Sequence, residues 1–263
     1  MKAVILLAAL LLVTSRLEAQ EHHHGDAAAT QAELDPATRA MSQGHDEPHQ
    51  MGPHMHLSTL REPGSGDQER AEAVVEQARP AVEKYRDYRV ALADGYRIFL
   101  PNVPQKMYHV TNYGHAAAAA VMFDPARPTS LLYEKHGSDY TLIGVMYTAP
   151  VGFTEDQLNQ RIPLSVAQWH QHVNMCRPPR GREREMFGPH PQFGLAGSIA
   201  TQAECDAAGG TFLPHVFGWM VHMYPWEKAP DAIWSVERQR SDMAAGSEHA
   251  GHDHGDRAGA EHH

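Results

Sequence analysis

After Gly95 the chain consists of short segments rich in β-branched and aromatic residues, and this pattern constrains the fold more than any other. Pro, Gly and Asn separate the segments, which is typical of a sheet of short, mostly antiparallel strands. We expect strands at residues 97–100, 107–111, 117–123, 131–134, 141–147, 166–176 and 216–224. Residues 135–139 contain Gly, Ser and Asp and predict the turn of a hairpin between two of these strands.

A helical stretch precedes the strands. Apolar residues recur at helical spacing from Asp67, the expected N-cap, to the stop at Gly95, and Pro80 predicts a kink or a division into two helices. Capping-box sequences predict two further short helices after Thr154 and Thr201. Together these elements predict an α+β domain, with an N-terminal helical segment packed on a mostly antiparallel sheet or partial barrel.

The N-terminus has the order of a secretory signal peptide. Lys2 supplies the basic start, residues 3–13 form an apolar run, and Ala19 is the small residue at which cleavage is expected. The run is too short to span a bilayer, and no later segment has the roughly 18 apolar residues of a membrane anchor. We therefore expect a secreted or periplasmic protein with no integral membrane segment after cleavage.

The predicted organisation has four parts: a signal peptide at 1–19, a disordered His/Met-rich tail at 20–66, one domain at 67–238 and a disordered His-rich tail at 239–263. The net charge of −10 is concentrated in the two tails. An acidic chain without a basic patch is a poor nucleic-acid or anionic-membrane binder, so we expect cations as partners. Methionine and histidine interleaved in the first tail are ligands that suit copper.

The chain has two cysteines, Cys176 and Cys205. In an oxidising compartment the expected state is a disulfide between them, closing a loop worth about 3–4 kcal/mol by the chain-entropy argument. The alternative is a thiolate metal ligand at Cys176, which follows two histidines.

Histidines in strand-like segments are the candidate metal ligands. His170 and His172 are two apart on an expected strand, so both rings point to one face, where imidazole suits zinc or copper. His222 and His109 lie in other apolar strands, where a histidine is costly to bury without a partner. We predict one metal site from these four residues, with Asn174 and Tyr108 as hydrogen-bond partners of the ring nitrogens. The competing hypothesis is that each histidine makes its own hydrogen bond in the core.

The histidine-x-histidine pair at His170 and His172, with the distant His222, resembles the metal site of cupin metalloenzymes. The likeness covers these three residues. A cupin has a glutamate soon after the pair, whereas Asn174 and Cys176 follow here. The resemblance implies a metalloenzyme with an open coordination position.

The sequence is therefore compatible with three functions. The first is an exported protein that sequesters or delivers copper or zinc, with the tails gathering the ion and the domain holding it. The second is an exported metalloenzyme with a cupin-like three-histidine site. The third is an envelope protein in which the histidines are incidental.

Overall fold

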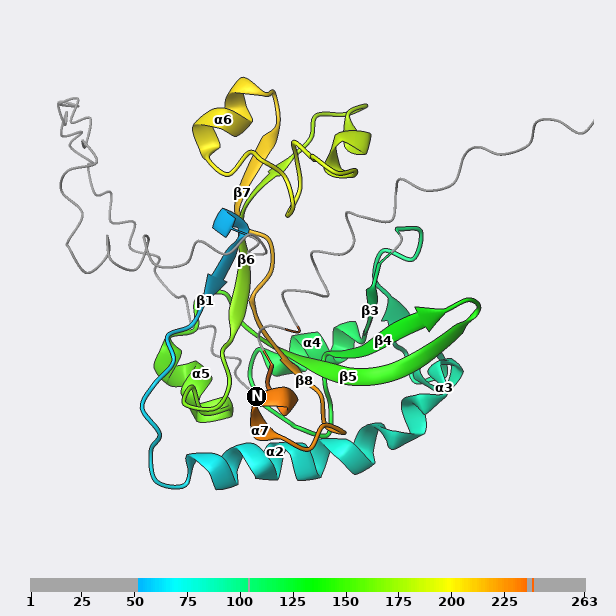
Figure 1. Ribbon diagram of the computed structural model, residues 1–263, viewed down its shortest axis with the longest axis vertical. Helices are drawn as coiled ribbons and strands as arrows, with labels where there is room; N and C mark the ends of the chain where they lie inside the picture. The colour runs from blue at the N-terminus through cyan, green and yellow to red at the C-terminus, as the bar shows by residue number, and fades with distance from the viewer. Residues whose placement is uncertain (1–51, 104, 236–237, 239–263) are drawn as a thin grey trace, which may run out of the picture. The chain divides into compact units, whose positions relative to one another are not determined.

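The structure of the chain is a computed structural model that describes residues 52–103, 105–235 and 238. It has an α+β arrangement with a mostly antiparallel open sheet, as the sequence predicts (Figure 1). The predicted signal peptide, the C-terminal tail from residue 239 and the first part of the N-terminal tail lie outside the described residues.

The described part contains six α-helices, three 3-10 helices and eight strands. The helices are η1 (Gly52–His54), α2 (Asp67–Val82), η2 (Glu83–Arg86), α3 (Tyr88–Ala93), α4 (Tyr113–Ala119), α5 (Glu155–Arg161), η3 (Glu183–Met186), α6 (Gln202–Ala207) and α7 (Pro230–Ile233). The strands are β1 (Met55–Leu57), β2 (Arg97–Ile98), β3 (Met107–Thr111), β4 (Ser130–His136), β5 (Asp139–Ala149), β6 (His170–Arg177), β7 (Thr211–His215) and β8 (Trp219–Met223).

The strands follow the order β1-β6-β8-β5-β4-β3-β2, and β7 pairs with β6 beside this path. All ladders between these strands in the described part of the chain are antiparallel. β4 and β5 form a long curved hairpin (Figure 1), with a register shift between Leu132 and Tyr133. A single residue pair, His170 with Met220, joins β6 to β8. One residue pair therefore connects the two parts of the sheet, and the candidate site lies at this connection.

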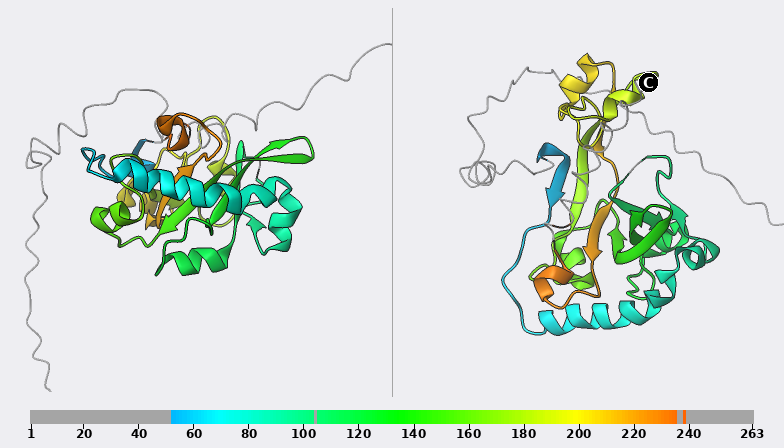
Figure 2. Two further views of the ribbon diagram at one scale, coloured as in Figure 1. Left: turned by 90° about the horizontal axis from the view of Figure 1, so that it is seen from below. Right: turned by 45° about the vertical axis from the view of Figure 1, so that its right-hand side comes forward.

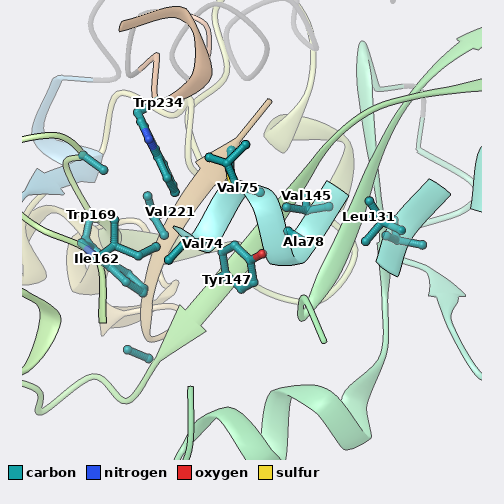
Figure 3. Packing of buried hydrophobic residues seen from close by; sticks show 14 of the residues in the cluster. Val74, Val75, Ala78, Leu131, Val145, Tyr147, Ile162, Trp169, Val221 and Trp234 are labelled. Carbon is teal, nitrogen blue, oxygen red and sulfur yellow. The ribbon is translucent and has the colours of Figure 1, made fainter. Parts of the chain in front are cut away.

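The helical segment covers one face of the sheet. In α2 the buried side chains recur every three or four residues, which gives the helix a single apolar stripe. Figure 3 shows Val74, Val75 and Ala78 of this stripe close to Val145 and Val221 of the sheet, with which they form the main core. The opposite face of the sheet is thus left to carry the candidate site.

Two details of this segment differ from expectation. The N-cap of α2 is Gly66, and Asp67 is the first helical residue, where its carboxylate accepts a hydrogen bond from the Gly64 N–H. Pro80 lies inside α2, and the division into separate helices comes after Val82. A proline in the last turn removes only one helical hydrogen bond, so the helix continues for two more residues.

The predicted strand at 117–123 is wrong, because this region begins with helix α4. Alanine has the highest helix propensity, and residues 116–120 are five alanines in succession. The Asn112 side chain accepts a hydrogen bond from the His115 N–H and caps the helix. Local capping and propensity therefore override the apolar pattern.

The prediction that residues 20–66 lack packed structure is also wrong for its last part. Residues 52–66 are described, and β1 pairs with β6 along Met55–Leu57. Ser58 is buried, and its hydroxyl accepts a hydrogen bond from the Trp169 N–H at 3.0 Å. The packed domain therefore begins before Asp67.

A disulfide between Cys176 and Cys205 confirms the sequence prediction, with 5.5 Å between the two Cα atoms. It links the far end of β6 to α6, where both cysteines join Phe193 and Ile199 in a small separate core. Figure 2 shows α6 lying at the end of β6 away from α2. Both capping boxes are present as predicted, at the starts of α5 and α6.

None of the helices in the described part of the chain has the length and apolar character needed to cross a membrane.

Candidate functional site

The two histidines of β6 are buried at the point where this strand is paired on both sides. His170 pairs with Leu57 of β1 and Met220 of β8, and His172 pairs with Met55 of β1. Their exposed fractions are 1% and 4%. Residues two apart on a strand point to the same face, and these two ring centroids lie 5.4 Å apart.

The register of the sheet places His222 on the same face as His170. Met220 of β8 is the partner of His170, and His222 follows Met220 by two residues. Cross-strand partners share a face, as do residues two apart on one strand. The ring centroids of His170 and His222 lie 5.3 Å apart, and His222 is 1% exposed.

His109 lies on β3, three strands away from β8 in the sheet, and its side chain is on the same face as His222. It shares its face of β3 with Thr111, which pairs with Ser130 of β4. Ser130 pairs with Met146 of β5, and Met146 pairs with His222. The Nε2 atoms of His109 and His222 lie 3.4 Å apart, with 5.3 Å between the ring centroids.

The structure thus brings together the four predicted residues, which we call the histidine cluster: His109, His170, His172 and His222. The contacts run as a chain, from His109 to His222 to His170 to His172. Within the described residues, no group of three or more His, Cys, Asp or Glu side chains is already arranged to hold one ion. The rings are neighbours, but their nitrogens do not converge on a common point.

Burial keeps three rings of the cluster, those of His109, His172 and His222, neutral at physiological pH. Burial lowers the pKa of His109 to about 4. It also lowers the pKa of His172 to about 4, with smaller contributions from His109 and His54. The pKa of His222 lies well below its ordinary value, because of burial first and then the neighbouring histidines. Neutral imidazole is the form that coordinates metal ions.

Two of the buried rings carry nitrogens whose hydrogen-bonding capacity is unused. The Nδ1 atoms of His172 and His222 have no hydrogen-bond partner among the described residues. Leaving such an atom unsatisfied costs about 1–3 kcal/mol. His115 is different, because its Nδ1 lies 3.1 Å from the Pro128 carbonyl and 3.2 Å from the Tyr96 hydroxyl. His115 therefore has the hydrogen-bond partners of an ordinary structural histidine. The Nδ1 atoms of His172 and His222 are instead available to a ligand.

The histidine cluster lies on the wall of a cavity of about 910 Å³. Apolar side chains make up most of the lining, including the buried Met107, Met146 and Met220. These methionines pack with Leu132 and Tyr224 on the histidine face of the sheet, as core filling residues do. The site is therefore concave, with a few polar groups on an apolar wall, which is the usual form of a small-molecule site.

The predicted roles of Asn174 and Tyr108 need correction. Asn174 has a φ of 56°, which breaks the alternation of β6, and its Nδ2 donates to the Pro53 carbonyl at 2.8 Å. Tyr108 points to the other face of β3 from His109, and its ring contacts that of Tyr140. Neither side chain is placed to orient the cluster.

Two residues beside the cluster were not identified from the sequence. His54 is 2% exposed; its Nε2–H donates to the Gly197 carbonyl at 2.7 Å, and its Nδ1 has no partner in the described part of the chain. Phe217 has its ring 6.4 Å from that of His172. His54 falls in the His/Met-rich stretch that was assigned to a disordered tail, and Phe217 falls in the strand expected at 216–224, so neither was recognisable as a neighbour of the cluster.

Comparison with known proteins adds no relative: no family model, no curated protein and no solved structure matches this chain.

Proposed function

We propose that this chain is an exported protein that binds a copper or zinc ion at the histidine cluster. The observation that carries the proposal is the 3.4 Å between the Nε2 atoms of His109 and His222. Two nitrogens bound to one ion at 2.0–2.1 Å, with a tetrahedral angle between them, lie about 3.3–3.4 Å apart. This pair therefore already has the spacing of two ligands of a single ion.

The spacing of the other rings supports the same geometry. A coordinated imidazole has its centroid about 3.2 Å from the ion, so tetrahedral neighbours have centroids about 5.2 Å apart. The three contacting pairs have centroids 5.3, 5.3 and 5.4 Å apart. Rotation about the Cβ–Cγ bond redirects a ring nitrogen while the centroid stays nearly fixed, and this torsion is broad for histidine.

Loading with an ion nevertheless requires movement. A three-ligand site centred on His222 needs the rings of His109 and His170 to approach each other, because only their contacts with His222 are already made. Both rings face the cavity, where side chains have room to turn. Binding should therefore be accompanied by ring rotation with little change in the sheet.

The features that favour export and those that favour metal binding support the same proposal. The signal-peptide pattern and the disulfide between Cys176 and Cys205 both favour an oxidising compartment. Histidines in both predicted tails would raise the local concentration of weak ligands around the domain. A sequestration or delivery protein uses these features together, with weak capture by the tails and tighter holding by the cluster.

The cavity also favours a second candidate, a metalloenzyme with three histidine ligands and one open position. The two functions differ in what completes the coordination of the ion. Electron paramagnetic resonance of the Cu(II)-loaded protein counts the bound nitrogens. Four nitrogens favour sequestration, whereas three nitrogens with an exchangeable water favour catalysis.

The test of the proposal is elemental analysis of protein purified from its own compartment, with residues 20–51 and 239–263 removed and the predicted signal peptide kept for export. We expect close to one equivalent of copper or zinc, retained through dialysis against a weak chelator. Less than about a tenth of an equivalent, before and after incubation with either metal, would show that the histidines are incidental.

A further inference from the structure

The cavity beside the histidine cluster has a chemical character that the ion alone does not explain. Among the described residues that line it there is no Asp or Glu, and Lys106 is the only Lys or Arg. The lining therefore offers no negative charge to a bound cation.

This charge balance determines what would accompany the ion. A divalent ion held by neutral imidazoles keeps its full charge, and an uncompensated charge on an apolar wall is strongly disfavoured. Carboxylate ligands usually reduce that charge, but the cavity supplies none. An anionic ligand at the open coordination position would supply it instead.

The volume and lining of the cavity indicate the chemical character of the ligand beyond its anionic group. About 910 Å³ is far more than one carboxylate fills, and it lies near the upper end of the range for small-molecule sites. The lining away from the histidines is mainly apolar, with side chains such as Leu195 and Val216. The remainder of the ligand must therefore be apolar.

The entrance is apolar as well. Several large hydrophobic residues that remain about half exposed also line the cavity: Leu100 (50%), Tyr113 (61%), Val151 (49%), Phe187 (48%) and Phe217 (43%). The centroid of the Phe217 ring lies 5.9 Å from that of Phe99 and 6.4 Å from that of His172. Phe217 therefore connects the exposed rim of the cavity to the cluster. Exposed apolar side chains around one opening are typical of a binding surface.

We propose that the cavity binds an amphipathic organic anion, with its apolar chain along the lining and its anionic head on the metal ion at the histidine cluster. This inference rests on the proposed metal site, and it names the class of molecule that the loaded site takes. A straight-chain carboxylate of about ten carbons has the required anionic head and apolar chain and is small enough to enter a cavity of this volume.

The test compares decanoate, 1-decanol and acetate by isothermal titration, on the metal-free and on the zinc-loaded protein. Decanoate should bind the zinc-loaded protein at least tenfold more tightly than the metal-free protein. Decanol should bind both forms within a factor of three, because it lacks the charge. Acetate should bind the zinc-loaded protein at least tenfold more weakly than decanoate does, because it lacks the apolar chain.

Two outcomes would overturn the inference while leaving the metal site intact. One is bound zinc, established by elemental analysis, with no gain in decanoate affinity. The other is equal affinity of the zinc-loaded protein for decanol and decanoate, which would indicate a neutral apolar ligand. Failure to bind zinc at all would instead overturn the proposed function, and the inference with it.

Variants in α4 and at its C-cap, Ala120, locate the binding. Ala116 and Ala120 line the cavity, whereas Ala117 is exposed and lies outside the lining. Ala116→Phe should lower decanoate affinity at least tenfold without changing the zinc content, and Ala117→Phe should change neither. Ala120→Phe provides a second test at a more exposed position if Ala116→Phe does not fold. Unchanged decanoate affinity in folded, zinc-loaded forms of both lining variants would contradict the location.

Discussion

His109 and His222 have their Nε2 atoms 3.4 Å apart although β3 and β8, which carry them, are separated in the sheet by β4 and β5. On a flat sheet, three strand spacings would keep two perpendicular side chains about 14 Å apart. The sheet must therefore curl around the face opposite α2. This curvature creates both the contact between the histidines and the cavity beside them.

The first prediction separates a metal-binding role of His222 from a structural role. Replacement by leucine keeps a similar volume and removes a buried nitrogen that has no partner in the described residues. We expect His222→Leu to lose the tight zinc equivalent, measured by competition with a chromogenic chelator. The free energy of unfolding of the metal-free protein should stay the same or rise by about 1 kcal/mol.

The matched control is His136→Leu, because the His136 side chain at the end of β4 is 64% exposed and lies outside the cluster. This variant should keep the zinc equivalent. Retention of zinc by His222→Leu would exclude the site, and a large loss of stability without metal would make His222 a structural residue.

Parts of this site were predictable from the sequence because they depend on local periodicity. The alternation that places His170 and His172 on one face holds at the start of β6, and the segment at 107–111 is a strand with the predicted bounds. The alternation fails at Asn174, where a left-handed backbone conformation changes the direction of the strand. No pattern of apolar residues indicates such a change in advance.

The remainder depends on long-range pairing. β1 is three residues long and lies in a polar, histidine-rich stretch, so it has no strand signal of its own. It forms by pairing with the distant strand β6, opposite His170 and His172. The curl of the sheet likewise arises from the register of several strands together. The cavity and His54 were therefore not accessible to reasoning along the chain.

The second prediction tests the corrected start of the domain. A chain that begins at Gly52 keeps η1 and β1, whereas one that begins at Leu60 lacks both. The longer chain should bind zinc as the full chain does at the cluster. The shorter one should melt about 5 °C lower or more, because β6 loses its edge partner, and its zinc affinity should fall at least tenfold. Equal melting temperatures, by circular dichroism, would show that β1 contributes nothing.

The third prediction concerns Gly210, which lies against the disulfide. A Cβ there would be 2.5 Å from the Cys176 sulfur and 2.9 Å from the Cys205 sulfur, closer than atoms can pack. Gly210→Ala should therefore lower the free energy of unfolding by about 2–4 kcal/mol, as loss of the disulfide would. Gly152→Ala is the control, because a Cβ there meets open space.

A double-mutant cycle tests the cause of this effect. In a Cys176→Ala, Cys205→Ala background both sulfurs are absent, so Gly210→Ala should cost at least 1 kcal/mol less than it does in the oxidised protein. Denaturant unfolding measures each variant. An equal cost in both backgrounds would place the strain in the contact with the Arg177 carbonyl, which a Cβ would meet at 2.8 Å.

The last prediction is the pH dependence of stability without metal. The pKa values of His109 and His172 are about 4 in the folded protein, against about 6.5 in the unfolded chain. Between these values the unfolded chain binds protons that the folded protein does not. Stability is therefore fully present above pH 6.5 and is lost as the pH falls, by up to about 1.4 kcal/mol per pH unit for each histidine.

Unfolding by denaturant at intervals between pH 6.5 and 5 measures this slope above the range in which most carboxylates titrate. His172→Leu should reduce the slope by about 1 kcal/mol per pH unit, because it removes one of the depressed groups, whereas His136→Leu should leave the slope unchanged. Saturating zinc should raise stability throughout, since it binds the folded form. A slope that is the same in His172→Leu and in the unmodified chain would show that His172 is accessible to protons, and that the cluster is not the buried, neutral group on which the metal site depends.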